Sequence, residues 1–449
     1  MSDSPKTSDP GHARSAAPVT ELKRGRLTPW LERAGPLTFS VFAIASAFST
    51  YFCMYAFRKP FAQGTFEGSV LLGGLGELDY KIALIISQVL GYCLSKFIGI
   101  KVIAEATRAG RGRAILALIA FAELSLVGFA LAPRPWGMLF LFLNGLPLGM
   151  VWGLVFGYLE GRRVSEALGA GLSASYIVAS MAVKSVGGVL LMKGISELWM
   201  PSLTGLLFAP ILGVSVWGLS QLPPPNQADR AARTERGPMD ADSRHAFVSR
   251  FAPGLLALTG LYVLLTAYRD FRDNFAREIW DAIGFEGKPG VMTYVELFVA
   301  FGVLCSLALI MRVKDNTRAV TVVHLVMLAG SLLIGLSTWA YDLGWIAPIV
   351  WMGCVGLGLY LGYVPFGCVL FDRLIAAVGF VGTAGFMIYV TDAFGYLGSV
   401  TLLLYKNFGE PNLSWLDFFR GFSYVTAAFC SAAFAFSMLY FRRIMKEST

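Results

Sequence analysis

Charged residues are scarce in this sequence. Asp, Glu, Lys and Arg make up only 15% of its 449 residues, whereas 56% are hydrophobic. A water-soluble domain usually carries about 25% charged residues. Apolar stretches of roughly 20 residues, long enough to cross a bilayer as helices, recur along the whole chain. The composition therefore excludes a soluble globular protein and predicts an all-α polytopic membrane protein.

The sequence also lacks the motifs of most enzymes. It has three histidines, and its six cysteines lie in apolar stretches without the spacing of a metal site or a disulfide framework. No glycine-rich loop ends in Lys-Ser or Lys-Thr, as ATP-binding loops do. The polar groups within apolar stretches form no recognisable nucleophile–base set or metal cluster. We therefore expect no catalytic activity, no metal and no cofactor.

Twelve apolar stretches predict twelve transmembrane helices. The first six are expected near Pro36–Phe57, Tyr80–Ile100, Arg113–Ala132, Trp136–Leu159, Leu168–Met192 and Leu203–Leu222, and the second six near Pro253–Arg269, Val291–Arg312, Ala319–Ala340, Trp345–Leu370, Ala376–Leu404 and Phe418–Phe441. The polar stretch between the sets predicts two pseudosymmetric six-helix bundles, at residues 35–222 and 253–441. Residues 223–252 would then form a linker, and residues 1–34 and 442–449 would form tails.

The net charge of +8 is distributed as in a membrane protein, not as in a nucleic-acid-binding protein. Basic residues concentrate in alternate connections: Lys101, Arg108, Arg111, Arg113, Arg162, Arg163, Arg312, Lys314, Arg318 and Arg373. The positive-inside rule places these connections, the linker and both termini in the cytoplasm. The first 33 residues lack the apolar region of a signal peptide. We expect a multi-pass protein of a bacterial inner membrane, without a nucleic-acid partner.

Ionisable residues inside apolar spans are costly and are therefore functional candidates. At the end of the first span, Tyr51, Tyr55 and Arg58 follow one another at spacings of four and three, so they share one helix face. Two phenols and a guanidinium suit an oxyanion, because Arg donates bidentately to phosphate or carboxylate. Alternatively, Arg58 and Lys59 near a helix end reach out to lipid headgroups.

The seventh span ends in a similar way, with Tyr268 and Arg269. In a pseudosymmetric carrier the first helices of the two halves face each other across a central cavity. Arg58 and Arg269 would then form a clamp for a doubly charged anion. The alternative is an extracellular ion-pair mesh that holds a gate, made by Arg269 with Asp270, Arg272 and Asp273.

Four further ionisable residues lie within predicted spans. Lys184 and Asp392 each precede a glycine by three residues, in the fifth and eleventh spans, and we expect them to form an ion pair between the halves. Glu123 and Glu296, in the third and eighth spans, are candidates for proton carriers or for hydrogen-bonded structural groups. His324 is expected to pack on a helix face and not to bind a ligand.

These residues together resemble the major facilitator superfamily, and within it the organophosphate:phosphate antiporters. The first helix of that family carries the pattern Tyr-x-x-x-Tyr-x-x-Arg-Lys-x-Phe, matched here by Tyr51, Tyr55, Arg58, Lys59 and Phe61. Gly91-Tyr92-Cys-Leu-Ser95-Lys96-Phe97 and Phe394-Gly395-Tyr396-Leu397-Gly398 are similar to further motifs of its second and eleventh helices. The resemblance implies that Arg58 and Arg269 bind the phosphate of the substrate. The sequence departs from the family at Lys184, which takes the place of a binding-site histidine, and at Asp392. We expect Lys184 to bind the substrate together with Arg58 and Arg269.

The resemblance implies a major facilitator fold that works by alternating access. We expect a monomeric secondary transporter that moves a small anionic solute, an organophosphate or a similar compound, in exchange for phosphate. Two alternatives remain open at this point. One is a proton-coupled symporter of carboxylates or other metabolites that uses Glu123, Glu296 or Asp392. The other is a membrane sensor on a transporter scaffold, which binds a ligand without moving it.

Overall fold

The structure is a computed structural model that describes residues 25–72, 76–105, 107–160, 162, 164–227, 229, 241–378 and 384–447. The predictions for residues 1–24, for Arg163, for residues 230–240 of the linker and for residues 448–449 lie outside this part of the chain. Within it, α-helices account for almost all regular structure. The only two strands of the described residues, β1 (Ser69–Leu72) and β2 (Gly76–Asp79), form one antiparallel hairpin.

Twelve helices of the described part have 18 residues or more. They are α2 (Pro36–Ala56), α3 (Tyr80–Glu105), α4 (Arg108–Leu131), α5 (Gly137–Leu159), α6 (Ser165–Met192), α7 (Met200–Gln221), α9 (Ala241–Asn274), α11 (Gly290–Met311), α12 (Asn316–Asp342), α13 (Pro348–Pro365), α15 (Ala384–Phe408) and α16 (Trp415–Glu447). Eleven of them, all except α15, are long and apolar enough over the described residues to cross a membrane. The predicted all-α polytopic membrane fold is confirmed.

Short helices lie at the ends of the long ones. They are α1 (Thr28–Arg33), the 3-10 helix η1 (Pro60–Gln63), α10 (Ala276–Trp280), the π-helical turns η2 (Asp281–Phe285) and η3 (Phe366–Leu370), and α14 (Phe371–Ala377). The tenth predicted span is therefore not one regular helix. It changes from α13 through η3 to α14 just after Pro365, because proline has no backbone N–H to continue the α-helical hydrogen bonds.

The seventh predicted span is longer than its apolar pattern indicated. We expected Pro253–Arg269, but α9 runs from Ala241 to Asn274. Its last turn contains Asp270, Arg272 and Asp273, all at most 8% exposed. These charges are paired inside the protein. A buried and paired charge does not interrupt a helix as hydropathy alone suggests.

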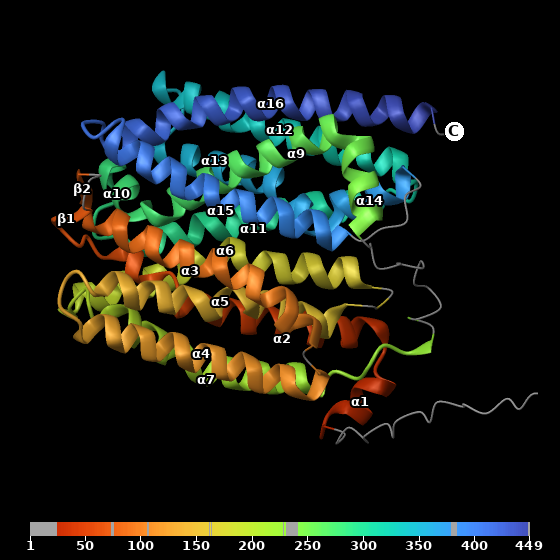
Figure 1. Cartoon of the computed structure of the whole chain (residues 1–449), viewed down its shortest axis with the longest axis horizontal. Coiled ribbons are helices and arrows are strands. Elements are labelled where there is room, and N and C mark those ends of the chain that lie inside the picture. The colour runs from red at the N-terminus through yellow and green to blue at the C-terminus, as the bar shows by residue number, and fades with distance from the viewer. Residues whose placement is uncertain are drawn as a thin grey trace, which may run out of the picture.

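The helices are arranged as two groups that lie side by side (Figure 1). In Figure 1 the helices from α2 to α7 fill the lower half, and those from α9 to α16 fill the upper half. Two helix pairs join the groups: α3 packs on α15, and α6 packs on α11. In order along the chain, α3 and α15 are the second and eleventh long helices, and α6 and α11 are the fifth and eighth. Each helix has its counterpart six positions away in the other group, so the two pairs are equivalent under the pseudosymmetry.

The two ends of the molecule differ. The hairpin and α10 lie at one end of the long axis, and α1, α14 and the C-terminus lie at the other (Figure 1). Large apolar side chains such as Leu124, Val214 and Phe298 point outward with more than two thirds of their surface exposed. Such an apolar outer surface is what contact with lipid requires, because a water-exposed patch of this kind would be unstable.

Candidate functional site

A cavity lies between the two helix groups and is lined mainly by tyrosines and charged residues. Its lining residues are Tyr51, Tyr55, Arg58, Lys59, Tyr92, Lys96, Trp152, Ser173, Tyr176, Ser180, Tyr262, Arg269, Asp270, Asp273, Tyr360, Tyr363, Gly367, Ile388, Asp392 and Tyr396. They come from α2, the turn that follows it, α3, α5 and α6 on one side and from α9, α13, η3 and α15 on the other. The cavity therefore includes eight of the 17 tyrosines of the chain.

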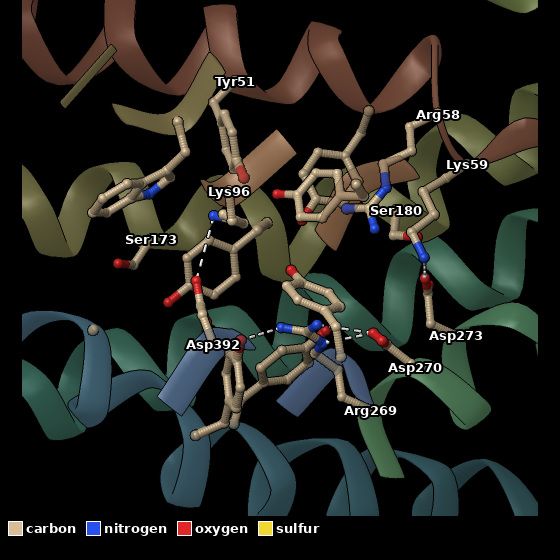
Figure 2. A pocket seen from close by; sticks show the side chains of 18 of the residues that line it. Tyr51, Arg58, Lys59, Lys96, Ser173, Ser180, Arg269, Asp270, Asp273 and Asp392 are labelled. Atoms are coloured by element: carbon tan, nitrogen blue, oxygen red, sulfur yellow. Dashed lines mark hydrogen bonds and ion pairs between the residues drawn. The ribbon is translucent and has the colours of Figure 1, made fainter. Parts of the chain in front are cut away.

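Arg58 enters this cavity from the helix group of α2, and Arg269 enters from the opposite group (Figure 2). The guanidinium of Arg58 lies 3.7 Å from the centre of the Tyr92 ring, which holds it by a cation–π contact. Arg58 is only 4% exposed, and its Nε has no hydrogen-bond partner. Within the described residues we find no carboxylate that forms an ion pair with it. Arg58 is therefore a buried cation that no carboxylate of the described residues contacts as an ion pair, which is a property expected of an anion-binding residue.

Arg269 is in a different state, because it is already neutralised. Its Nε and Nη2 both donate to Asp270 Oδ1, at 3.1 and 2.8 Å, and its Nη1 donates to the hydroxyl of Tyr363. The other carboxylate oxygen of Asp270 accepts a 2.8 Å hydrogen bond from Ser399 of α15. Asp270 thus binds its neighbour Arg269 and at the same time anchors α9 to α15.

At the hairpin end, one aspartate joins the two helix groups. Asp273 of α9 forms ion pairs with Lys59, which follows α2, and with Lys184 of α6 at 2.7 Å. Ser180 of α6 also donates to Asp273, and Lys59 donates to Asn274 at 3.1 Å. Lys184 is 1% exposed and does not line the cavity. Two buried lysines therefore share one carboxylate across the boundary between the groups.

Nearer the other end, Asp392 of α15 pairs with Lys96 of α3 at 3.3 Å (Figure 2). Asp392 also accepts a hydrogen bond from Tyr262 of α9, whose hydroxyl lies 2.8 Å from that of Tyr363. Lys96 and Asp392 belong to the helix pair α3–α15, so this contact too crosses between the groups.

Two predictions from the sequence do not match this geometry. The expected ion pair between Lys184 and Asp392 is absent, because the two residues have different partners. Their helices, α6 and α15, occupy equivalent positions in the two groups, but α6 packs on α11 and α15 packs on α3. Equivalent residues on α6 and α15 therefore do not meet.

The second difference concerns Tyr268, which we expected beside Arg269 in the site. It is fully buried away from the cavity, where its hydroxyl lies 2.6 Å from Ser423 Oγ of α16 and its ring stacks on Phe419. Consecutive residues of an α-helix point about 100° apart, so Tyr268 and Arg269 cannot face the same side. Tyr262 is seven positions before Arg269, which is nearly two turns, and it lines the cavity instead.

Four other candidates, Glu296, Arg272, Glu123 and His324, are not among the residues that line the cavity. Glu296 of α11 pairs with Arg272 of α9 at 2.6 Å, and both are 1% exposed. Glu123 of α4 accepts a hydrogen bond from Ser202 of α7. Among the described residues, Asp273 contacts the opposite helix group through ion pairs, whereas Asp270 and Arg272, the other two residues expected at a gate, pair within their own group. His324 packs inside its own group, with Nδ1 2.8 Å from Val320 O and Nε2 3.0 Å from Ser437 Oγ.

The described residues contain no cluster of three or more His, Cys, Asp or Glu that could hold a metal ion. Six of the lining aromatic residues were not among the site residues predicted from the sequence: Trp152, Tyr176, Tyr262, Tyr360, Tyr363 and Tyr396. Tyr360 and Tyr363 are three positions apart on α13 and Tyr92 and Lys96 are four apart on α3, so each pair shares a helix face. This spacing was a usable signal, but it is common in apolar helices.

Comparisons with known proteins agree with the fold and identify a family. The chain is similar to the structure described as "Crystal structure of D-xylose-proton symporter", with a TM-score of 0.60 and 14% sequence identity over 89% of this chain and 97% of that one. This likeness shows that the two chains share a fold. No match is found among curated proteins. The family model described as "Family of unknown function (DUF5690)" matches residues 60–444, so the chain belongs to that family.

Proposed function

We propose that the chain is a secondary transporter that moves a small anionic solute across a membrane by alternating access. The observation that carries this proposal is the state of Arg58. A buried guanidinium without a carboxylate partner is costly unless an anion binds it. Arg58 faces a cavity lined by both helix groups, so a bound anion would contact both groups at once.

The contacts between the groups support alternating access. Among the described residues, many of these contacts lie at the hairpin end, where Asp273 binds Lys59 and Lys184, Lys81 pairs with Glu278, and Arg277 donates to the Gln63 carbonyl at 2.7 Å. In that region Ser185 also lies 2.7 Å from Thr293. This pattern fits a carrier closed at the hairpin end, and transport would require these contacts to break while others form at the opposite end.

The orientation in the membrane forms part of the proposal. The C-terminal end of α16, the helix that contains Arg442 and Arg443, lies at the end opposite the hairpin, as does α14, which contains Arg373 (Figure 1). Because consecutive spans run in opposite directions, we expect the other basic connections at this same end. The positive-inside rule then places this end and both termini in the cytoplasm of a bacterial inner membrane, and the hairpin outside. The closed hairpin end would make this an inward-facing arrangement of a monomeric carrier.

Two transport reactions fit an anion site of this kind. The resemblance of the first helix to organophosphate antiporters favours exchange of an organic phosphate for phosphate. The position of Asp392 favours proton coupling as the alternative. Its carboxylate lines the cavity and contacts Lys96 and Tyr262, and protonation of the carboxylate would change both contacts. A D-xylose–proton symporter with a similar fold is consistent with the second reaction.

The first test is thermal stabilisation of the purified protein by a panel of phosphates, phosphate esters and carboxylates. We expect at least one anion to stabilise the wild type and to lose its effect in Arg58→Ala. The matched control is Arg113→Ala, which removes an exposed arginine at the start of α4. Stabilisation that is unchanged in Arg58→Ala would refute the anion site.

The second test is uptake of the stabilising anion into proteoliposomes. Uptake that depends on an internal counter-anion would identify exchange, and uptake driven by an inward proton gradient alone would identify proton coupling. Binding without uptake under either condition would refute transport and would support a membrane sensor.

A further inference from the structure

The cavity has a specific balance of charge. Four of its lining residues are cations, Arg58, Lys59, Lys96 and Arg269, and three are acids, Asp270, Asp273 and Asp392. Each acid forms an ion pair with one of the lining cations other than Arg58: Asp270 with Arg269, Asp273 with Lys59, and Asp392 with Lys96. The lining therefore has a surplus of one positive charge, and Arg58 carries it.

Lys184 does not add a second available charge to the cavity. Its amine reaches Asp273 from α6, where it binds both the carboxylate, at 2.7 Å, and the main-chain carbonyl of the same residue. The side chain is 1% exposed and is not among the lining residues. A solute in the cavity meets Arg58 directly, whereas it would have to displace Asp273 to reach Lys184.

Arg269 is unavailable for the same kind of reason. To reach Arg269, a second negative charge on the solute would have to approach the ion pair of Arg269 and Asp270. The Asp270 carboxylate would repel it. To bind Arg269 it would have to replace two hydrogen bonds from the guanidinium to Asp270 and would leave that carboxylate, 5% exposed, without its cation.

We propose that the cavity binds solutes with a single negative charge, and that Asp270 determines this specificity by occupying Arg269. The proposal rests on the proposed function and narrows its solute to small organic monoanions, of which monocarboxylates are the simplest. Phosphate monoesters, which carry nearly two charges at neutral pH, would be disfavoured. The two-arginine clamp for a doubly charged anion is therefore not what the cavity offers in this structure.

The rest of the cavity is suited to the uncharged part of such a solute. Tyr55, Tyr360 and Tyr396 line the cavity, and no hydrogen bond is found for their hydroxyls within the described residues. Each phenol can donate one hydrogen bond and accept another. They come from α2, α13 and α15, so they would contact the solute from both helix groups.

The experiment uses compounds that differ mainly in charge: glucose, glucuronate and glucarate on one carbon skeleton, and glycerol, glycerate and glycerol 3-phosphate on another, together with lactate and malate. The concentration for half-maximal thermal stabilisation is measured at pH 7.5 and constant ionic strength, in wild type, Arg58→Ala and Asp270→Asn. In the wild type, at least one monoanion should bind tenfold or more tightly than its dianionic counterpart. Asp270→Asn frees Arg269, so it should reverse this preference.

Two controls separate charge from packing. Asp281→Asn removes a partly exposed acid that pairs with Arg277 outside the cavity, and it should leave the preference unchanged. The double variant Arg269→Gln with Asp270→Asn removes one positive and one negative charge, so the cavity lining keeps a surplus of one positive charge. It should therefore retain the monoanion preference. This variant also provides a result if Asp270→Asn alone fails to fold.

Each other outcome overturns a defined part of the reasoning. A dianion that binds the wild type as tightly as the matched monoanion, and depends on Arg58, refutes the single-charge proposal but leaves the anion transporter intact. A monoanion preference that persists in Asp270→Asn refutes the role of Asp270. Failure of every anion to show an Arg58-dependent effect refutes the proposed function itself, and with it this inference.

Discussion

Replacing Glu296 with Gln is expected to destabilise the protein strongly. Glu296 and Arg272 form an ion pair of 2.6 Å between α11 and α9, and their side chains are 1% and 2% exposed. The only other hydrogen bond of the Arg272 guanidinium among the described residues is to the Met352 carbonyl, at 3.2 Å. Glu296→Gln would therefore leave a buried cation with one neutral acceptor and a weaker amide contact.

The size of the effect follows from the loss of this counter-charge. Two charges about 4 Å apart attract by about 4 kcal/mol at an effective dielectric constant of 20. Breaking a buried pair by removing one partner typically costs about 3–5 kcal/mol. At roughly 2–4 °C per kcal/mol for a unit the size of one helix group, the melting temperature should fall by about 10 °C.

The assay is thermal unfolding of the purified variants in detergent. Glu123→Gln is the matched control, because Glu123 accepts a hydrogen bond from Ser202 and no ion pair is found for it in the described part of the chain. Its melting temperature should change by a few degrees at most. The double variant Arg272→Met with Glu296→Leu should recover most of the loss, since replacing a whole buried pair by apolar residues is far less costly than breaking it.

A Glu296→Gln variant as stable as the wild type would refute this reasoning. It would mean that Glu296 is already neutral in the folded protein, so that the substitution removes no charge. Glu296 would then have to be reconsidered as a proton carrier, which was one of the two roles its place in an apolar span allowed.

Three further predictions concern contacts between the helix groups and the direction of Tyr268. Asp273→Asn should lower the melting temperature more than Lys184→Met. The first substitution leaves two buried lysines without an ion-pair partner, whereas the second leaves Asp273 paired with Lys59. Equal decreases in melting temperature would contradict the shared carboxylate. Asn407→Ala removes the hydrogen bond that Asp79 N donates to Asn407 Oδ1, at 3.1 Å, and the one that Asn407 Nδ2 donates to Glu77 O, at 3.2 Å. It should increase hydrogen exchange in strands β1 and β2, and the control Thr401→Ala should leave exchange there unchanged. Tyr268→Phe should cost about 1 kcal/mol of stability, because it removes the contact with Ser423, and should leave the thermal stabilisation by anions unchanged. Tyr262→Phe should alter the thermal stabilisation by anions. The opposite result would place Tyr268 in the site.

The fold was predictable because it depends on a signal that every span repeats. The predicted first residues of eleven of the twelve spans lie inside a long helix or within a few residues of its start. Hydropathy alone located these eleven spans. We did not predict the C-terminal end of α9, because a cluster of charged residues such as Asp270, Arg272 and Asp273 is typical of a loop when their ion-pair partners are unknown. The β1–β2 hairpin was missed because its strands have four residues each, too few to show an alternating pattern.

The site was predictable only within one helix at a time. Helical spacing placed Tyr51, Tyr55 and Arg58 on one face, and all three line the cavity. The same reasoning, applied to the spacing from Tyr262 to Arg269, would have selected Tyr262 over Tyr268. The partners across helices were not accessible in this way: Lys96 meets Asp392 because α3 packs on α15, and no single sequence reveals that pairing.

The contrast between Arg58 and Arg269 shows why a motif does not determine the solute. Both arginines line one cavity, which they enter from opposite helix groups (Figure 2). The charge that a solute meets depends on what each guanidinium already binds: Tyr92 for Arg58, and the Asp270 carboxylate for Arg269. Asp270 is adjacent to Arg269 in the sequence, but adjacency on a helix does not imply contact, so the pairing had to be seen in the structure. A single aspartate therefore separates a site with two available charges from a site with one, while every residue of the first-helix motif stays the same.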